Sequence, residues 1–172
     1  MSYTFHETVR LQVGAFKKGF NSIFPLESLR AFSTSSELEE LVCGANVNDD
    51  EWTNLQALAH HIVPAHGYHQ KSHEYLDFLR MLTLLTRDER KKFLRFSTGS
   101  SRLPRGGFEA LDPKMTVVYK KPIDPKENPD NILPSVMTCQ NFLKLPSYSS
   151  FEVLKSRFEK AYNEGNNNFT LS

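Results

Sequence analysis

The spacing of the apolar residues changes its period along the chain, and that change limits the folds available to it. Over residues 5–23, apolar side chains recur every three or four positions, for example at Phe16 and Phe20, so they share one face of a helix. Between residues 115 and 145, short runs of β-branched and apolar residues favour strands instead. Helical spacing returns over residues 149–165. The pattern predicts an α+β fold in which helices pack on a small sheet.

Capping residues locate several of the expected helices. Thr86 followed by Glu89 is the signature of a capping box, in which each side chain accepts a hydrogen bond from the other residue's backbone amide. Gly99 then supplies a residue that tolerates the left-handed conformation common at helix ends. Ser36 followed by Glu39 predicts the same kind of start for a shorter helix.

Charge is distributed unevenly, although the whole chain carries a formal net charge of only +1. Residues 1–70 hold 4 basic and 8 acidic side chains, whereas residues 71–172 hold 17 and 12. The stretch 65–72 also interrupts the helical spacing. We therefore predict a domain boundary near residue 70, between an all-helical part (1–70) and a second part (71–172) that folds without the first.

Composition excludes several classes of protein. The apolar fraction of 39% and the charged fraction of 24% are typical of a globular protein and not of a disordered one. No apolar run is long enough to cross a membrane, and the N-terminus lacks the features of a secretory signal. With only Cys43 and Cys139 available, we expect no disulfide framework. Both thiols are expected to be reduced, in the cytoplasm or the nucleus.

The two cysteines have different surroundings in the sequence. Cys139 follows a short β-branched run and precedes a polar pair, and a proline-rich segment lies ahead of it. This context predicts an exposed thiol at the end of a strand. Cys43 instead follows Leu41 and Val42 on an apolar helical stretch, which favours a small buried side chain.

No metal, cofactor or nucleic-acid site is predicted. The histidines all lie in the part of the chain up to His73, and the cluster from His60 to His73 matches no common zinc spacing. The basic residues between Arg87 and Arg95 have the spacing of a solvated helix face, and no nucleic-acid motif accompanies them. The glycine pair at 106–107 is not followed by the residues of a phosphate-binding loop.

Five short segments form a recognisable pattern when they are taken in order along the chain. They are 14–20 with 37–44, 66–68, 93–108, 133–148, and Phe169, which stands fourth from the end. Together they resemble the HECT family of ubiquitin ligases. The segment around Cys139, with Leu-Lys-Leu-Pro behind it, looks most like the ubiquitin-fusion-degradation branch. The resemblance implies that residues 1–70 are the C-terminal portion of a HECT N-lobe, whose start is missing, and that residues 71–172 are a C-lobe.

The same resemblance implies a ubiquitin-protein transferase that needs no cofactor. Cys139 would accept ubiquitin as a thioester from a conjugating enzyme and pass it to a lysine of a protein substrate. Thr138 is a candidate for stabilising the oxyanion, although an ordinary strand threonine is an equally good interpretation. Phe169 is implied to dock between the lobes, the alternative being that it packs on its own last helix. Trp52 and Leu55 resemble a region that contacts the conjugating enzyme, with a core tryptophan as the competing interpretation.

Two other functions stay open at this point. The chain could be a catalytically weak ubiquitin-binding or interaction module, because most of the implied N-lobe is missing. It could also be a thiol hydrolase, although no histidine follows His73 and hydrolysis needs a base to activate water. Glu152 and the terminal carboxylate of Ser172 are candidate bases for the attack of a lysine on the thioester.

Overall fold

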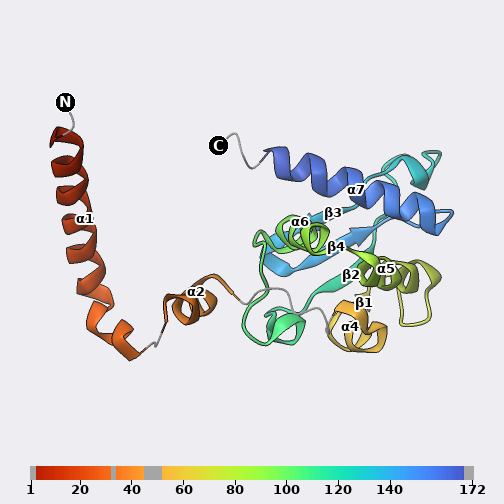
Figure 1. Ribbon diagram of the computed structural model, residues 1–172. Coiled ribbons are helices and arrows are strands. Elements are labelled where there is room, and N and C mark those ends of the chain that lie inside the picture. Colours follow the sequence, from red (N-terminus) through yellow and green to blue (C-terminus); the bar gives the residue numbers. More distant parts are fainter. Residues whose placement is uncertain (1–2, 32–33, 45–51, 169–172) are drawn as a thin grey trace. The chain divides into compact units, whose positions relative to one another are not determined.

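The computed structural model describes residues 3–31, 34–44 and 52–168, and the chain divides into two compact units (Figure 1). We call residues 1–42 the N-terminal unit and residues 43–172 the C-terminal unit. Together they contain helices and a small mixed sheet, which confirms the predicted α+β class. Within the described residues, no helix combines the length and apolar character needed to span a membrane.

The N-terminal unit is helical. It contains α1 (Tyr3–Ile23), the 3-10 helix η1 (Leu26–Ala31) and most of α2 (Ser35–Cys43). Phe16 and Phe20 stack on the exposed face of α1, with ring centroids 6.0 Å apart. The capping box of α2 is formed by Thr34 and Glu37, whose side chains each accept a hydrogen bond from the other's amide. The prediction of Ser36 and Glu39 for this role is therefore wrong by two residues.

The C-terminal unit alternates helices with short strands. Its α-helices are α4 (Leu55–His61), α5 (His73–Leu84), α6 (Arg87–Thr98) and α7 (Phe151–Asn168). Its strands are β1 (Val63–Ala65), β2 (Thr116–Tyr119), β3 (Ser135–Met137) and β4 (Phe142–Leu145). Single 3-10 turns are η2 (Gly107–Ala110), η3 (Pro129–Asn131) and η4 (Thr138–Gln140).

The local signals of α6 are confirmed. Thr86 and Glu89 form the predicted capping box, and Gly99 ends the helix in the left-handed conformation at a φ of 82°. Glycine is favoured there because it has no Cβ to clash with the preceding carbonyl group.

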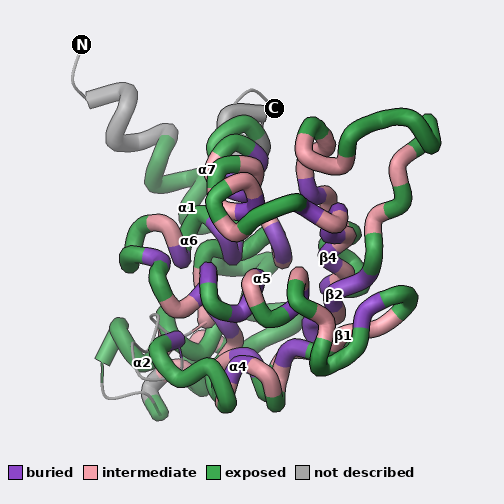
Figure 2. The backbone as a smooth tube through the Cα atoms, turned by 90° about the vertical axis from the view of Figure 1, so that its right-hand side faces the viewer, coloured by how far each residue is buried: buried purple, intermediate pink, exposed green. Residues whose placement is uncertain are grey.

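The sheet has the strand order β1-β2-β4-β3. Strands β1, β2 and β4 run parallel, whereas β3 pairs antiparallel with β4. Side chains alternate between the two faces, so Val117, Leu143 and Leu145 enter the main core. Rings of Phe78, Phe93 and Phe158 meet them from α5, α6 and α7. In Figure 2 the strands lie to one side of these helices, with buried residues between the two layers.

Residues before position 70 belong to the same core as those after it. Trp52, Leu58 and Ile62 are fully buried in the main core, and β1 is hydrogen-bonded along β2. The packing therefore divides the chain near residue 43 and not near residue 70. We correct the expectation that residues 71–172 fold alone, because that fragment lacks strand β1 and four buried core side chains, namely Trp52, Leu58, Ile62 and Tyr68. Where the family's two lobes meet in this sequence stays a prediction.

Candidate functional site: the Cys139 turn

Cys139 lies in the connection between β3 and β4. The strand β3 ends at Met137, and Cys139 is the middle residue of the 3-10 turn η4. Its side chain is exposed and forms no disulfide, which confirms the predicted exposure. The predicted position at the end of a strand is wrong by two residues, because β3 ends at Met137 and Cys139 lies in the turn that follows. Cys43 is also exposed, which contradicts the expectation of a buried side chain. Its exposure on α2 leaves a second thiol in the chain that lies on no comparable turn.

Paired strands hold both ends of the η4 turn. Met137 pairs with Phe142 across the antiparallel ladder, so the connection is fixed at residues 138–141. Leu143 is buried on β4 and Val136 packs against the same core from β3. A shift of register would move these apolar side chains to the other face of the sheet. The thiol is therefore carried by a frame whose register is set by the core.

Asn141 is the buried residue of this connection, and it was not predicted as a site residue. Its backbone is left-handed, with a φ of 50°, which asparagine tolerates better than most residues other than glycine. Its side-chain amide donates a 2.7 Å hydrogen bond to the Pro113 carbonyl oxygen. The backbone carbonyl oxygen of Asn141 accepts a hydrogen bond from the Thr116 amide at 2.9 Å. An asparagine two residues after a turn cysteine is a signal that could have indicated it.

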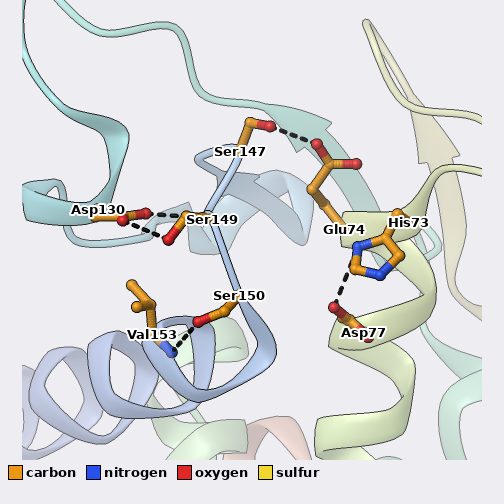
Figure 3. Close-up of polar contacts among 8 residues, drawn as sticks. All are labelled: His73, Glu74, Asp77, Asp130, Ser147, Ser149, Ser150 and Val153. Atoms are coloured by element: carbon orange, nitrogen blue, oxygen red, sulfur yellow. Dashed lines mark hydrogen bonds and ion pairs between the residues drawn. The ribbon is translucent and has the colours of Figure 1, made fainter.

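The segment that leads into β3 is fastened to the start of α7. Asp130 accepts hydrogen bonds from both the amide and the hydroxyl of Ser149, at 2.8 and 2.5 Å (Figure 3). The guanidinium of Arg157 donates to the Asp130 carbonyl oxygen, and the hydroxyl of Tyr148 donates to the carbonyl oxygen of Ile132. The chain therefore enters the thiol-bearing hairpin from a fixed position.

The hydrogen bonds from Ser149 hold the pKa of the Asp130 carboxyl below its ordinary value. A depressed folded-state pKa stabilises the protein above the unfolded pKa of about 3.9 and loses that contribution as the pH falls through the folded value. We expect Asp130→Asn to lower the melting temperature at pH 7 and to have a smaller effect near pH 3, which lies below the unfolded pKa, where the contribution is already declining. Thermal melts at both pH values check this. In a Ser149→Ala background the pH-dependent difference should shrink, and an equal difference at both pH values would contradict the assignment.

No histidine is hydrogen-bonded to Cys139 within the described residues. The ring of His66 lies against Phe142 at the start of β4, with 6.4 Å between the two ring centroids. We find no hydrogen bond or ion pair to the Cys139 sulfur in residues 3–31, 34–44 and 52–168. Those residues also contain no cluster of ligands suited to a metal ion. The fold therefore does not bring a cysteine–histidine pair together in the part of the chain that is described.

The other predicted site residues have different placements. Thr138 is exposed at the first position of η4, next to Cys139, and Glu152 is in the first turn of α7. Their proposed roles stay predictions. Phe169 and Ser172 lie outside the described residues.

Trp52 is a core residue. Its indole is fully buried, with its ring centroid 4.9 Å from that of Phe108 and 6.1 Å from that of Phe93. The guanidinium of Arg90 lies over the same indole at 5.4 Å. A side chain enclosed in this way has no surface for a partner, so the predicted contact with a conjugating enzyme is wrong for Trp52. Leu55 is exposed at the start of α4, and its contact stays a prediction.

A shallow pocket of about 260 Å³ lies at the far end of the parallel strands. It is lined by residues that follow β1, end β2 or follow β4, namely Gly67, Tyr68, Tyr119 and Ser147, together with Ser72 and Glu74. In Figure 3 the Glu74 carboxylate is hydrogen-bonded to the Ser147 hydroxyl. Because Cys139 precedes β4 and the pocket follows it, the pocket is separate from the thiol site.

Comparison with known proteins identifies the family. The model of the HECT domain, described as a ubiquitin-transferase domain, matches residues 1–172. The chain belongs to the HECT family. It is 41% identical over 170 residues to the E3 ubiquitin-protein ligase TRIP12 of Danio rerio. The aligned region covers 99% of this chain and 8% of TRIP12.

Two further relatives support the HECT assignment. The E3 ubiquitin-protein ligase UPL3 of Arabidopsis thaliana is 41% identical over 173 residues, covering 95% of this chain and 9% of the relative. Ubiquitin fusion degradation protein 4 of Saccharomyces cerevisiae is 38% identical over 164 residues, covering 95% of this chain and 11% of the relative. This confirms the resemblance to the ubiquitin-fusion-degradation branch. The chain spans only about a tenth of the length of these HECT relatives.

Proposed function

We propose that this chain is the part of a HECT ubiquitin-protein transferase that carries the thioester, with Cys139 as the nucleophile. The observation that carries the proposal is an exposed thiol on a turn held by two paired strands, in a chain that matches the HECT model from end to end. An exposed position is required because both the donor and the acceptor are proteins that must reach the sulfur. The partners are ubiquitin, a ubiquitin-conjugating enzyme and protein substrates.

The proposed reaction has two exchanges. In the first, the Cys139 thiolate attacks the carbonyl carbon of the ubiquitin glycine held by the conjugating enzyme. A new carbon–sulfur bond forms, and the donor's carbon–sulfur bond breaks to release its cysteine as a thiolate. Because one thioester replaces another, the step is nearly balanced in free energy, and placement of the two sulfurs supplies most of the rate.

In the second exchange, a neutral lysine amine of the substrate attacks the same carbonyl carbon. The carbon–nitrogen bond forms, Cys139 leaves as a thiolate, and the proton on nitrogen passes to a base. Thr138 adjoins the reacting sulfur and is the candidate donor to the oxyanion. Glu152 and the terminal carboxylate of Ser172 are candidates for the base. We place the chemistry in the reducing environment of the cytoplasm or the nucleus, where a free thiol persists.

A single-turnover assay tests the proposal. The 172-residue chain is mixed with an excess of conjugating enzyme that already carries ubiquitin, and the products are separated on a non-reducing gel. A new adduct on the chain that disappears with reductant supports the thioester. Absence of an adduct, with binding of ubiquitin retained, would favour the interaction module. Release of free ubiquitin without an adduct would favour a hydrolase.

Phe169 tests the second exchange separately. It is the aromatic residue of a polar tail, so we expect its ring to dock and to position the thioester. Phe169→Ala should slow transfer to lysine by on the order of a hundredfold, because a misplacement near 1 Å can have that effect. The alkylation rate of Cys139 and the melting temperature should stay unchanged, and Leu171→Ala serves as the control in the same tail. A lower melting temperature with an unchanged transfer rate would show that the ring packs on α7 instead.

A further inference from the structure

The connection that carries Cys139 is exposed except for one residue. Met137, Thr138, Cys139 and Gln140 are all exposed, whereas Asn141 is only 8% exposed. Exposed residues bury little apolar surface that could hold the turn in one conformation. The position of the sulfur therefore depends on the paired strands, on helix α6, which lies against η4, and on what holds Asn141.

Asn141 links the turn to a distant part of the chain. Its amide donates to the Thr138 carbonyl oxygen at 3.4 Å and closes the turn around Cys139. Its backbone carbonyl oxygen accepts from the Thr116 amide at 2.9 Å, which is the first hydrogen bond of the parallel ladder between β2 and β4. Its side chain donates to the Pro113 carbonyl oxygen at 2.7 Å. Since a carbonyl oxygen can only accept, the side-chain atom facing Pro113 must be the NH₂ group.

The left-handed backbone of Asn141 gives the turn its direction. With a φ of 50° and a ψ of 34°, this residue turns the chain from η4 into β4. Most other L-residues are disfavoured in this conformation, whereas glycine adopts it freely. Asparagine thus combines two properties at this position. It tolerates the left-handed backbone, and its side-chain amide is long enough to reach the Pro113 carbonyl oxygen.

We propose that Asn141 is a positioning residue for Cys139, because its side-chain amide fixes the thiol turn to the segment ahead of β2. This inference rests on the proposed function of Cys139. Loss of the side-chain amide should leave the sulfur exposed and reactive but no longer held at one place. Exchange between two protein-bound thioesters should then slow, since it depends on placement more than on nucleophilicity.

Two variants separate the two properties of Asn141. Asn141→Asp keeps the shape of the side chain but replaces the donor with an oxygen that faces the Pro113 carbonyl group. Asn141→Gly keeps the left-handed backbone and removes the amide altogether. Gln140→Ala is the matched control, because its side chain is exposed on the same turn. All are made in the 172-residue chain with Cys43→Ala, so that Cys139 is the remaining thiol.

Three quantities are measured for every variant, the two rates at a temperature below all of the melting temperatures. They are the melting temperature, the rate of alkylation of Cys139 by iodoacetamide, and the single-turnover rate of ubiquitin transfer from a charged conjugating enzyme over a range of its concentrations. For Asn141→Asp and Asn141→Gly, we expect alkylation within about twofold of the parent and a maximal transfer rate lower by about tenfold or more. The half-saturating concentration of the donor should stay unchanged, and Gln140→Ala should match the parent in all three.

The outcomes are distinct. If the parent accepts ubiquitin and both variants transfer at the parental maximal rate, the positioning role is overturned. Equal falls in alkylation and transfer would also overturn it, because they would indicate a general loss of structure. If Asn141→Asp does not fold, Asn141→Gly decides the question, since its backbone preference suits the site. If the parent itself accepts no ubiquitin, the proposed function of Cys139 fails, and the inference fails with it.

Discussion

Cys139→Ala is expected to abolish the reductant-sensitive ubiquitin adduct completely, because no other group in the turn can form a thioester. Cys139→Ser should instead yield a small amount of an adduct that resists reductant. A hydroxyl is a much poorer nucleophile at neutral pH than a thiol, but the oxygen ester that it forms is more stable than a thioester. Non-reducing and reducing gels of the wild-type chain and both variants check these results.

Cys43 provides an internal control for this experiment. It is a second exposed thiol in the same chain, and it lies on α2 instead of on a turn between paired strands. Cys43→Ala should therefore load ubiquitin at the wild-type rate. If Cys139→Ala still formed the adduct and Cys43→Ala did not, the assignment of the nucleophile would be reversed.

Removal of residues 1–70 is expected to prevent folding, whereas removal of residues 1–42 should not. The fragment that begins at Lys71 loses three fully buried side chains, those of Trp52, Leu58 and Ile62, together with strand β1. Truncation of a single large buried side chain costs about 2–5 kcal/mol. Three such losses are comparable with the whole stability of a small domain, which is about 5–15 kcal/mol.

Circular dichroism melts and amide NMR spectra of the two fragments check this expectation. The chain beginning at Cys43 is the matched control, because it retains the whole compact C-terminal unit. It should melt cooperatively and give well-dispersed amide signals. A cooperative melt of the chain beginning at Lys71 would show that the residues before it are dispensable, as the charge distribution suggested.

Helices could be predicted from the sequence where their ends carry local chemistry. The capping box of Thr86 and Glu89 needs only neighbouring residues, and it lies where expected. Strand β1 could not be predicted in the same way, because Val63-Pro64-Ala65 is short and contains a proline. Proline is tolerated there since β1 is an edge strand. That position in the sheet is decided by pairing with residues more than fifty positions away.

The candidate site was predictable in part for the same reason. Cys139 is indicated by the residues directly around it. The anchor of its turn depends on Pro113 and Thr116, which are distant in sequence and become neighbours only in the fold. Trp52 shows the opposite error. A large aromatic residue suits both a partner surface and a core, and only the packing of Phe93 and Phe108 around it distinguishes the two.

The place of the η4 turn in the sheet determines how Cys139 can move. The turn begins β4, which is an inner strand bonded to β2 on one side and to β3 on the other. Sliding the sulfur along the direction of β4 would break hydrogen bonds in both ladders at once. The thiol is therefore held against movement along the strand. If Cys139 carries ubiquitin as proposed, that ubiquitin moves together with the sheet of the C-terminal unit and not with a separately mobile turn.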